Sequence, residues 1–331
     1  MRENIAFLAF TERGARLAET LRTSLGGEVT RARGGEDFSL SRWTGERFTT
    51  CRALVFVGAA GIAVRAVAPY LRSKAADPAV VVLDEGGRFV IPLLSGHLGG
   101  ANELAENIAA LCGGTPVITT ATDVNGVFAV DLWARRQGLT VLRPERIKSV
   151  SAGLLAGETV RISCPWPVAG EPPPGVLLTE GDAAVRVTVR PREGPELCLV
   201  PRALVLGVGC RKGVSAGTIE GVFARFCRER RVLPEAIIAA ATIDRKAEEP
   251  GLLAFCRSRG WPLRCDSAGA LARVPGEFTA SPFVERTVGV DSVCERAAVL
   301  AAAGALIEKK YAAEGVTFAL ALKTPRLDWS W

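Results

Sequence analysis

The chain has 331 residues, of which 48% are hydrophobic and 23% charged, and its formal net charge is +6. This length and composition are typical of a globular protein with two or three domains. The basic surplus suits an anionic partner. However, no block of Lys and Arg with interleaved aromatic residues indicates nucleic acid, and no apolar stretch approaches the ~20 residues of a membrane span.

Cysteine and histidine usage limits the metal and redox chemistry. Nine cysteines occur singly, without a Cys-x-x-Cys pair, and there is one histidine. A structural zinc site is therefore not expected. The first residues are too soon followed by charge to resemble a secretory signal peptide, so the thiols are expected to be reduced. These features predict a cytoplasmic protein with no metal ligands of its own.

The first third of the chain alternates short apolar runs with helical patterns. Strands are predicted at 4–10, 29–33, 53–57, 80–83, 88–93 and 116–118. Helices are expected after the first, third and fifth of these strands, and Thr11 is expected to cap the first helix. Trp43 is assigned to a loop. This alternation predicts an α/β sandwich over residues 1–126.

The pattern of predicted strands and helices changes at about residue 127 and again after residue 200. Helices at 127–137 and 144–156 and short strands at 160–164, 176–179 and 184–189 predict a small middle α+β domain, 127–200. The last domain, 201–331, is predicted to be α/β again, with strands at 203–206, 237–243, 261–265 and 316–322 and helices from Ser215, at 250–259, at 267–273 and at 292–310. The tail from Thr324 is expected to pack on a neighbour or to be frayed.

The most informative stretch runs from an apolar strand through Ser95-Gly96-His97-Leu98-Gly99-Gly100 into a helical pattern. A buried strand that leads into a glycine-rich turn and a helix can present backbone N–H groups to an anion. His97 is the only side chain here with an unperturbed pKa between pH 5 and 8. We therefore take His97, Ser95 and Asp123 as candidate catalytic residues.

Three segments follow predicted strands and are candidates for one site. They are Gly58–Gly61, Ser95–Gly100 with Asn102, and Thr119–Asp123. Because ligands collect at the carboxyl ends of strands in open α/β sheets, these segments are expected to converge. The candidate binding residues among them are Gly58, Gly61, Gly96, Gly99, Gly100, Asn102, Thr119 and Thr120.

Two chemical interpretations of the His97 turn stay open. No Gly-x-Ser-x-Gly elbow is present, so a covalent mechanism would have to pair Ser95 with His97 only two residues away. Activation of water by His97 is favoured over that arrangement. Asp123 and Glu103 either orient the imidazole ring or serve as helix caps and solvated charges.

A second glycine-rich segment, Gly207-Val208-Gly209-Cys210-Arg211-Lys212-Gly213, follows a predicted strand. It is not a dinucleotide fingerprint, because the third glycine comes four residues after the second rather than three. It is interpreted either as a tight turn or as an anion cradle. In the second case Gly207 and Gly209 would shape the cradle, while Arg211 and Lys212 would supply positive charge.

Several of these segments together resemble the CbiG family, the cobalt-precorrin-5A hydrolases of anaerobic cobalamin biosynthesis. The segments are Val57–Arg65, Lys74 with Asp77–Val80, Leu94–Ala105, Ile118–Asp123, Gly207–Arg211, Lys246–Gly251 and Val290–Ala298. The Ser-Gly-His-Leu-Gly-Gly-Ala-Asn block is the most specific, and the last domain is also similar to the stand-alone CobE protein. Arg296 departs from the small residue or proline expected at its position.

The resemblance implies a hydrolase that opens the δ-lactone of cobalt-precorrin-5A and releases acetaldehyde. For that reaction we expect His97 to be the base that activates water, N–H groups around Gly99 and Gly100 to form the oxyanion site, and Arg65, Lys74, Arg211 and Lys212 to hold peripheral carboxylates. The resemblance implies no protein cofactor, since the substrate carries the cobalt, and a small-molecule corrinoid as partner. A homodimer and transient contact with the neighbouring methyltransferases stay open. The alternatives are a non-catalytic corrinoid carrier and a nucleotide-binding enzyme.

Overall fold

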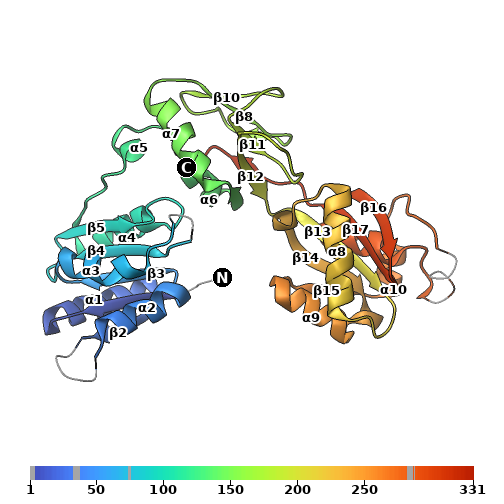
Figure 1. Ribbon diagram of the computed structural model, residues 1–331, viewed down its shortest axis with the longest axis horizontal. Helices are drawn as coiled ribbons and strands as arrows, with labels where there is room; N and C mark the ends of the chain where they lie inside the picture. Colours follow the sequence, from blue (N-terminus) through green and yellow to red (C-terminus); the bar gives the residue numbers. More distant parts are fainter. Residues whose placement is uncertain (1–3, 33–37, 74–75, 282–285, 287) are drawn as a thin grey trace. The chain divides into compact units, whose positions relative to one another are not determined.

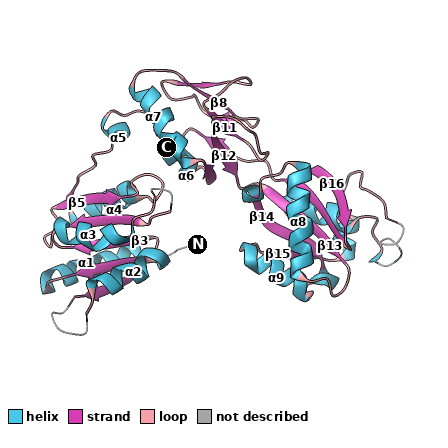
Figure 2. Ribbon diagram, in the orientation of Figure 1, coloured by secondary structure: helices cyan, strands magenta, loops and turns pink. Residues whose placement is uncertain are grey.

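The structure, a computed structural model, describes residues 4–32, 38–73, 76–281, 286 and 288–331. Contacts divide the chain into an amino-terminal unit, residues 1–135 with 154–157, and a carboxyl-terminal unit, residues 136–153 with 158–331. Figure 1 labels their elements and Figure 2 separates helices from strands. Within the described ranges, no helix has the length and apolar character needed to cross a bilayer.

The amino-terminal unit is built on one six-stranded sheet with the order β2-β1-β3-β4-β5-β6. Its strands are β1 (Ile5–Ala9), β2 (Glu28–Arg31), β3 (Ala53–Val57), β4 (Ala79–Leu83), β5 (Phe89–Leu94) and β6 (Thr115–Pro116). The first four are parallel, whereas β5 runs antiparallel to β4 and β6 runs parallel to β5. The predicted hairpin between β4 and β5 is thereby confirmed.

Helices cover both faces of this sheet (Figure 2). They are α1 (Glu12–Leu25), α2 (Leu40–Thr50), α3 (Ala60–Val67) and α4 (Ala101–Cys112). The short α5 (Ala121–Val124) and α6 (Val130–Arg136) come after β6 in the chain. Alternate residues of β1 enter different cores: Phe7 packs with α1 and α4, and Leu8 packs with α2 and α3. This period of two is the packing expected of a doubly covered sheet, and it confirms the predicted α/β sandwich.

Trp43 corrects one prediction, because it lies in α2 and not in a loop. It is buried, and its indole N–H donates to Thr30 Oγ1 at 3.0 Å. The helix was missed because it buries only Trp43, Thr44 and Phe48. Three buried residues in eleven make too weak an apolar stripe to reveal a helix by its periodicity.

The carboxyl-terminal unit contains two five-stranded sheets. The first has the order β10-β8-β11-β12-β7 and consists of β7 (Leu139–Leu142), β8 (Val160–Ser163), β10 (Val176–Leu178), β11 (Val185–Val187) and β12 (Leu197–Pro201), with α7 (Ile147–Leu155) inserted. The second has the order β15-β14-β13-β17-β16 and consists of β13 (Leu204–Cys210), β14 (Ile237–Ile243), β15 (Leu263–Asp266), β16 (Ala305–Ala313) and β17 (Val316–Leu322).

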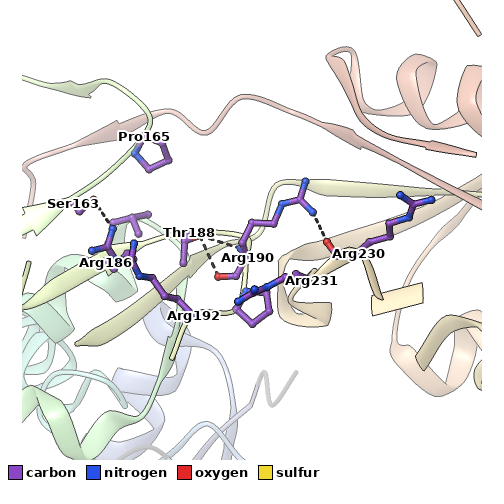
Figure 3. A pocket seen from close by; sticks show the side chains of 10 residues that line it. Ser163, Pro165, Arg186, Thr188, Arg190, Arg192, Arg230 and Arg231 are labelled. Carbon is purple, nitrogen blue, oxygen red and sulfur yellow. Dashed lines mark hydrogen bonds between the residues drawn. The ribbon is translucent and has the colours of Figure 1, made fainter. Parts of the chain in front are cut away.

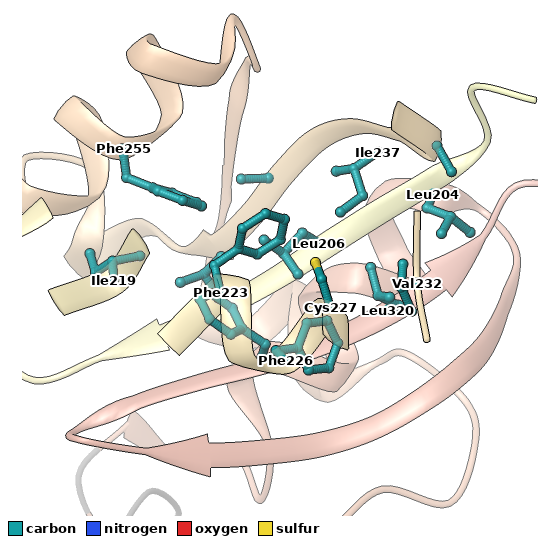
Figure 4. Close-up of a cluster of buried hydrophobic side chains, with 14 of the residues drawn as sticks. Leu204, Leu206, Ile219, Phe223, Phe226, Cys227, Val232, Ile237, Phe255 and Leu320 are labelled. Carbon is teal, nitrogen blue, oxygen red and sulfur yellow. The ribbon is translucent and has the colours of Figure 1, made fainter. Parts of the chain in front are cut away.

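The helices of the second sheet are α8 (Ala216–Arg230), α9 (Pro250–Arg259), α10 (Ala268–Ala272) and α12 (Val293–Ala302). Aromatic residues of α8 and α9 fill one core (Figure 4). The rings of Phe223 and Phe255 lie edge to face with centroids 5.5 Å apart, an arrangement that stabilises beyond the area it buries. The predicted Ser215 cap is confirmed, since its hydroxyl accepts from the Thr218 N–H.

The predicted helix 292–310 is wrong in its second half. It ends at Ala302, Ala303 takes the left-handed conformation with φ 47°, and β16 follows. A side chain at Gly304 would overlap the backbone carbonyl of Leu322, so the chain turns tightly there. The Ala, Leu, Glu and Lys residues of this segment favour helix, but pairing of β16 with β17 overrides that preference.

The carboxyl-terminal tail is ordered and packs on its own unit. Leu327–Asp328 form β18, which pairs in parallel with β9 (Val168–Ala169). Leu327 and Trp329 are buried, and Gln137 Nε2 donates to Asp328 Oδ1 at 2.9 Å. The expectation of a frayed tail is therefore wrong.

Candidate active site

The only histidine lies in the turn between β5 and α4, as predicted. The turn is closed by backbone hydrogen bonds: the Gly100 N–H donates to the His97 carbonyl at 3.0 Å, and the Ala101 N–H donates to the Ser95 carbonyl at 3.1 Å. Ser95 and Gly100 take left-handed conformations, with φ of 57° and 83°. The Gly100 N–H is therefore occupied within the turn, which does not favour its expected role as an oxyanion donor.

Glycine is required in this turn for close approach as well as for conformation. A side chain at Gly99 would overlap the Cβ of Ser95, and one at Gly100 would overlap the guanidinium of Arg135. At Gly96 a side chain would meet the amide group of Asn102. Only a backbone without Cβ atoms can bring these groups so near to the turn.

His97 is held between two carboxylates. Its Nδ1 lies 3.0 Å from Asp131 Oδ1, and its Nε2 lies 2.9 Å from Asp123 Oδ2. The side chains of His97 and Asp131 are only 8% and 9% exposed, whereas Asp123 is 26% exposed. The Asp123 end of this arrangement is therefore the one that a substrate can reach.

Asn102 extends the arrangement across the first turn of α4. Its Nδ2 donates to Asp123 Oδ2 at 2.9 Å and to Thr120 Oγ1 at 3.0 Å. We call these five side chains the His97 network: His97, Asn102, Thr120, Asp123 and Asp131. Thr119, also predicted for the site, is exposed at the adjacent position.

The protonation state of His97 follows from its partners. An ionised carboxylate only accepts hydrogen bonds, so each ring nitrogen must donate to bond both aspartates. Burial alone lowers the pKa of His97, but the hydrogen bonds and negative charges of Asp131 and Asp123 outweigh it and raise the pKa above its ordinary value. The geometry thus favours an imidazolium, a proton donor, and not the neutral base that was expected.

Asp131 was missed by the sequence interpretation, which named Asp123 and Glu103 as orienting groups. Glu103 instead pairs with Arg135 at 2.7 Å. Asp131 lies in the first turn of α6, where an acidic residue is common in any helix because it favours the helix dipole. Nothing local therefore distinguished it from an ordinary helix-start carboxylate.

Ser95 is not arranged as a nucleophile activated by His97. Its hydroxyl is buried and donates to the Asp77 carbonyl at 3.1 Å. Both ring nitrogens of His97 already face aspartates. This geometry supports a role for Ser95 in fixing the turn to the start of β4, and it gives no support to the covalent alternative.

The expected convergence of three strand ends is wrong for one of them. The Gly58 N–H donates to the carbonyl of Leu83, the last residue of β4, which pairs with the beginning of β5. Ser95 instead follows the end of β5, which pairs with Val80 near the beginning of β4. Antiparallel β5 therefore separates Gly58 from Ser95 by roughly 15 Å of strand.

The neighbours of Gly58 share this separation. Gly61 and Arg65 lie in α3 beyond Gly58, and Arg65 Nη1 donates back to the Gly61 carbonyl at 3.3 Å. These residues are not part of the His97 network. Lys74, the other predicted cation of this region, lies outside the described residues.

The Gly207–Gly213 segment is also not the turn that was predicted. Gly207 and Gly209 lie inside β13 and pair with Ala319 and Thr317 of β17. The turn begins only after Cys210, where the Arg211 N–H donates to the Gly315 carbonyl at 2.9 Å. Lys212 follows on the surface.

A carboxylate of the chain itself occupies the anion position of this turn. Glu249 Oε1 accepts the Gly213 N–H at 2.7 Å, and its Oε2 lies 2.9 Å from Lys246 Nζ. The hydrogen bond from Lys246, aided by that from Gly213, lowers the pKa of the buried Glu249. An external anion at Gly213 would have to displace this pair.

No metal-ligand cluster was predicted, and within the described ranges no group of three or more His, Cys, Asp or Glu side chains has the arrangement of a metal site. The chemistry of the His97 network is that of proton transfer between an imidazolium and the partly exposed carboxylate of Asp123. The network can therefore hold a positive charge next to a polar substrate and exchange protons with it.

Comparison with known proteins gives matches along most of the chain. Family models described as Cobalamin synthesis G N-terminal, Cobalamin biosynthesis central region and Cobalamin synthesis G C-terminus match residues 42–123, 128–201 and 204–321. The exact domain limits stay a prediction.

Three curated relatives are similar over most of their length. A "Cobalt-precorrin-5A hydrolase" of Salmonella typhimurium is 36% identical over 96% of this chain and 97% of its own. One of Priestia megaterium is 33% identical over 83% and 79%. A "Probable cobalt-precorrin-5A hydrolase" of Methanocaldococcus jannaschii is 27% identical over 96% and 98%. The chain thus belongs to the CbiG family of cobalamin biosynthesis proteins.

Proposed function

We propose that this protein is a cobalt-precorrin-5A hydrolase, which opens the δ-lactone of its substrate to give cobalt-precorrin-5B and acetaldehyde. The supporting observation is that two relatives with this activity in their names match 96% and 83% of the chain. The His97 network adds a buried imidazole and a carboxylate that a substrate can reach, two groups that can catalyse hydrolysis.

In the proposed reaction the imidazolium of His97 stabilises negative charge that develops on the lactone as water attacks. A positive group in a partly buried site does this more strongly than one in water. This assigns to His97 the role first expected of the N–H groups around Gly99 and Gly100. When the ring opens, the leaving oxygen takes from Asp123 the proton that came from the attacking water, because both N–H groups of His97 stay bonded to aspartates.

Asp123 is the proposed base. Its Oδ2 already accepts from His97 and Asn102, and among the described residues its side-chain Oδ1 has no hydrogen-bond donor. An oxygen in that position can accept a proton from the attacking water within hydrogen-bond distance. Asp131 holds the opposite side of the ring and orients it without reaching the substrate.

The proposal also covers the cofactor, the substrate, the cellular location and the assembly of the protein. The cobalt is taken to be part of the substrate, with no cofactor resident in the protein, and the corrinoid to be the small-molecule partner. A cytoplasmic location fits the lack of a membrane-crossing helix among the described residues. A homodimer and transient contact with neighbouring pathway methyltransferases are proposed as states to test by light scattering and co-purification.

The direct test is anaerobic incubation of the protein with cobalt-precorrin-5A while acetaldehyde is measured. Release of acetaldehyde with the corrinoid product is the expected result. Binding of the corrinoid without any acetaldehyde would contradict the hydrolase and favour the carrier alternative. A thermal shift caused by nucleotides would instead favour a nucleotide-binding enzyme.

Replacing Asp131 by asparagine should move the alkaline limb of the kcat profile to lower pH. Asp131 helps to raise the pKa of His97, and the acidic form is the active one, so activity is lost as pH rises through a pKa that is now lower. On the acid side, kcat should stay within about threefold, a change of less than ~1 kcal/mol in the barrier.

The same substitution has a stability signature that separates it from general damage. A raised histidine pKa contributes stability that is complete below pH 6.5 and disappears as pH rises through the folded-state pKa. The urea midpoint of the wild-type protein should therefore be higher than that of Asp131→Asn, and this difference should be larger at pH 6 than at pH 9. An unshifted alkaline limb would contradict the assignment of Asp131.

A further inference from the structure

A pocket in the carboxyl-terminal unit is lined by five arginines. It has a volume of about 580 Å³, and its lining residues are Ser163, Pro165, Arg186, Val187, Thr188, Arg190, Pro191, Arg192, Arg230 and Arg231. We call it the arginine pocket (Figure 3). Among the residues that the structure describes, no carboxylate lines it.

The arginines are supplied by two separate parts of the sequence. Arg186 lies in β11 and two more arginines follow it, whereas Arg230 ends α8 and Arg231 caps it. A helix carboxyl terminus attracts cations through its dipole, which accounts for Arg230 and Arg231. It does not account for the three arginines that approach from the strand.

Two carboxylates behind the lining are shared among four of these guanidinium groups. Glu196 accepts from Arg186 at 3.2 Å and lies 3.8 Å from Arg192. Glu308 lies 2.6 Å from Arg190 and 3.9 Å from Arg230. The side chains of Glu196 and Glu308 are only 8% and 14% exposed. They hold the arginines from behind and leave positive charge toward the pocket.

Hydrogen bonds fix the inner arginines in place. Arg186 Nη1 donates to Ser163 Oγ at 3.0 Å, and Arg190 Nη1 donates to the Arg230 carbonyl at 2.6 Å (Figure 3). Guanidinium groups held in this way lose little further side-chain entropy when they bind an anion. The inner wall is therefore preorganised for negatively charged groups.

Arg192 and Arg231 form the rim of the pocket, where the arginines are more exposed and their positive charge is less neutralised by carboxylates. The side chain of Arg192 is 60% exposed, and no ion pair of Arg231 is present in the described part of the chain. Arg231 holds a left-handed conformation, φ 52°, at the helix end, where glycine or asparagine would be less strained. Both rim arginines can reach a ligand that enters from solvent.

We propose that the arginine pocket binds carboxylate side chains of a corrinoid polycarboxylate. The inference rests on the proposed function, which makes a macrocycle with many peripheral carboxylates the substrate. Arginine forks bind carboxylates through paired hydrogen bonds, while Pro165, Val187 and Pro191 offer apolar contact to the hydrocarbon edge between those arms. Arg65 and Lys74 are not needed for this role.

The test uses calorimetric titration of the whole protein with two corrinoids. Cobyrinic acid, whose peripheral carboxylates are free, should bind, and cobinamide, whose side chains are amides, should bind at least tenfold more weakly. The variant Arg192→Gln/Arg231→Gln should weaken cobyrinic acid binding by about tenfold or more, since lost charge-assisted hydrogen bonds are worth at least this factor. Arg192→Lys/Arg231→Lys should restore only part of the affinity.

The matched control is Arg228→Gln/Arg257→Gln, which removes the same charge from exposed positions outside the pocket. It should bind cobyrinic acid like the wild type. Equal affinity of the rim variant and this control would overturn the proposal. Binding of citrate or pyrophosphate as tight as that of cobyrinic acid, with the same dependence on the rim, would overturn the corrinoid assignment and leave a general polyanion site.

Acetaldehyde release is measured on the same preparations, so the two proposals fail separately. A wild-type protein that releases acetaldehyde, with a rim variant unchanged in KM and in binding, would keep the hydrolase and reject the pocket. A wild-type protein without release, but with rim-dependent corrinoid binding, would keep the pocket and reject the hydrolase. The expected result is release by both proteins, with a higher KM in the rim variant.

Discussion

His97→Ala is expected to lower kcat for acetaldehyde release by about 10²- to 10⁴-fold, the usual contribution of a positioned acid or base. The substitution removes the imidazolium that faces Asp123 and leaves two aspartates, Asp123 and Asp131, near each other without the cation between them. The measurement is anaerobic kinetics with cobalt-precorrin-5A. Substrate binding should change much less than kcat, because the charge matters most in the transition state.

Two comparison variants sharpen this result. Ser95→Ala removes a hydroxyl whose hydrogen bond goes to the Asp77 carbonyl, and kcat should stay within about threefold because no reacting group is lost. Asp123→Asn removes the proposed base and should reduce kcat nearly as far as His97→Ala. If His97→Ala kept kcat within about threefold of wild type, the network would not be the site of the chemistry.

Gly207→Ala is expected to lower the free energy of unfolding by about 3 kcal/mol, at the upper end of the usual cost of overpacking. A Cβ at Gly207 would overlap the carbonyl of Cys294 in α12 and press on the Ala298 side chain. Because the obstacle is backbone of a helix packed on β13, it cannot move aside cheaply. The measurement is the urea unfolding transition.

The control for this prediction is Gly221→Ala in α8. A Cβ there would meet nothing within 4 Å, and alanine in a helix interior is favoured over glycine by up to ~1 kcal/mol. Gly221→Ala should therefore leave stability unchanged or raise it. If Gly207→Ala kept its stability but weakened corrinoid binding, Gly207 would belong to a binding site after all.

Much of the fold could be predicted because each unit's cores follow local patterns. Uninterrupted apolar runs such as Ala53–Val57 become fully buried strands, and Thr11 and Ser215 mark helix starts through their own hydroxyl groups. The predictions failed where a long-range contact overrode local preference, as at Ala305–Ala313, where pairing with β17 forms a strand from a sequence that contains the helix formers Ala, Leu, Glu and Lys.

In the candidate site, too, the local features could be predicted from the sequence and the long-range contacts could not. The His97 turn was visible because glycines, serine and the only histidine follow one another in the chain. Strand direction was not visible: antiparallel β5 carries His97 away from Gly58 and toward Asp123, which follows the parallel β6. The partner Asp131 and the protonation of the ring depend on how α6 packs against the turn.

The sequence by itself therefore determined the α/β class, the turn that holds the histidine and the family. Only the tertiary structure decided which carboxylates flank the ring, which glycines are buried against a helix and which arginines share a pocket. The physical reason is that capping, periodicity and turn chemistry act over a few residues, whereas charge pairing and close packing depend on residues tens to hundreds of positions apart.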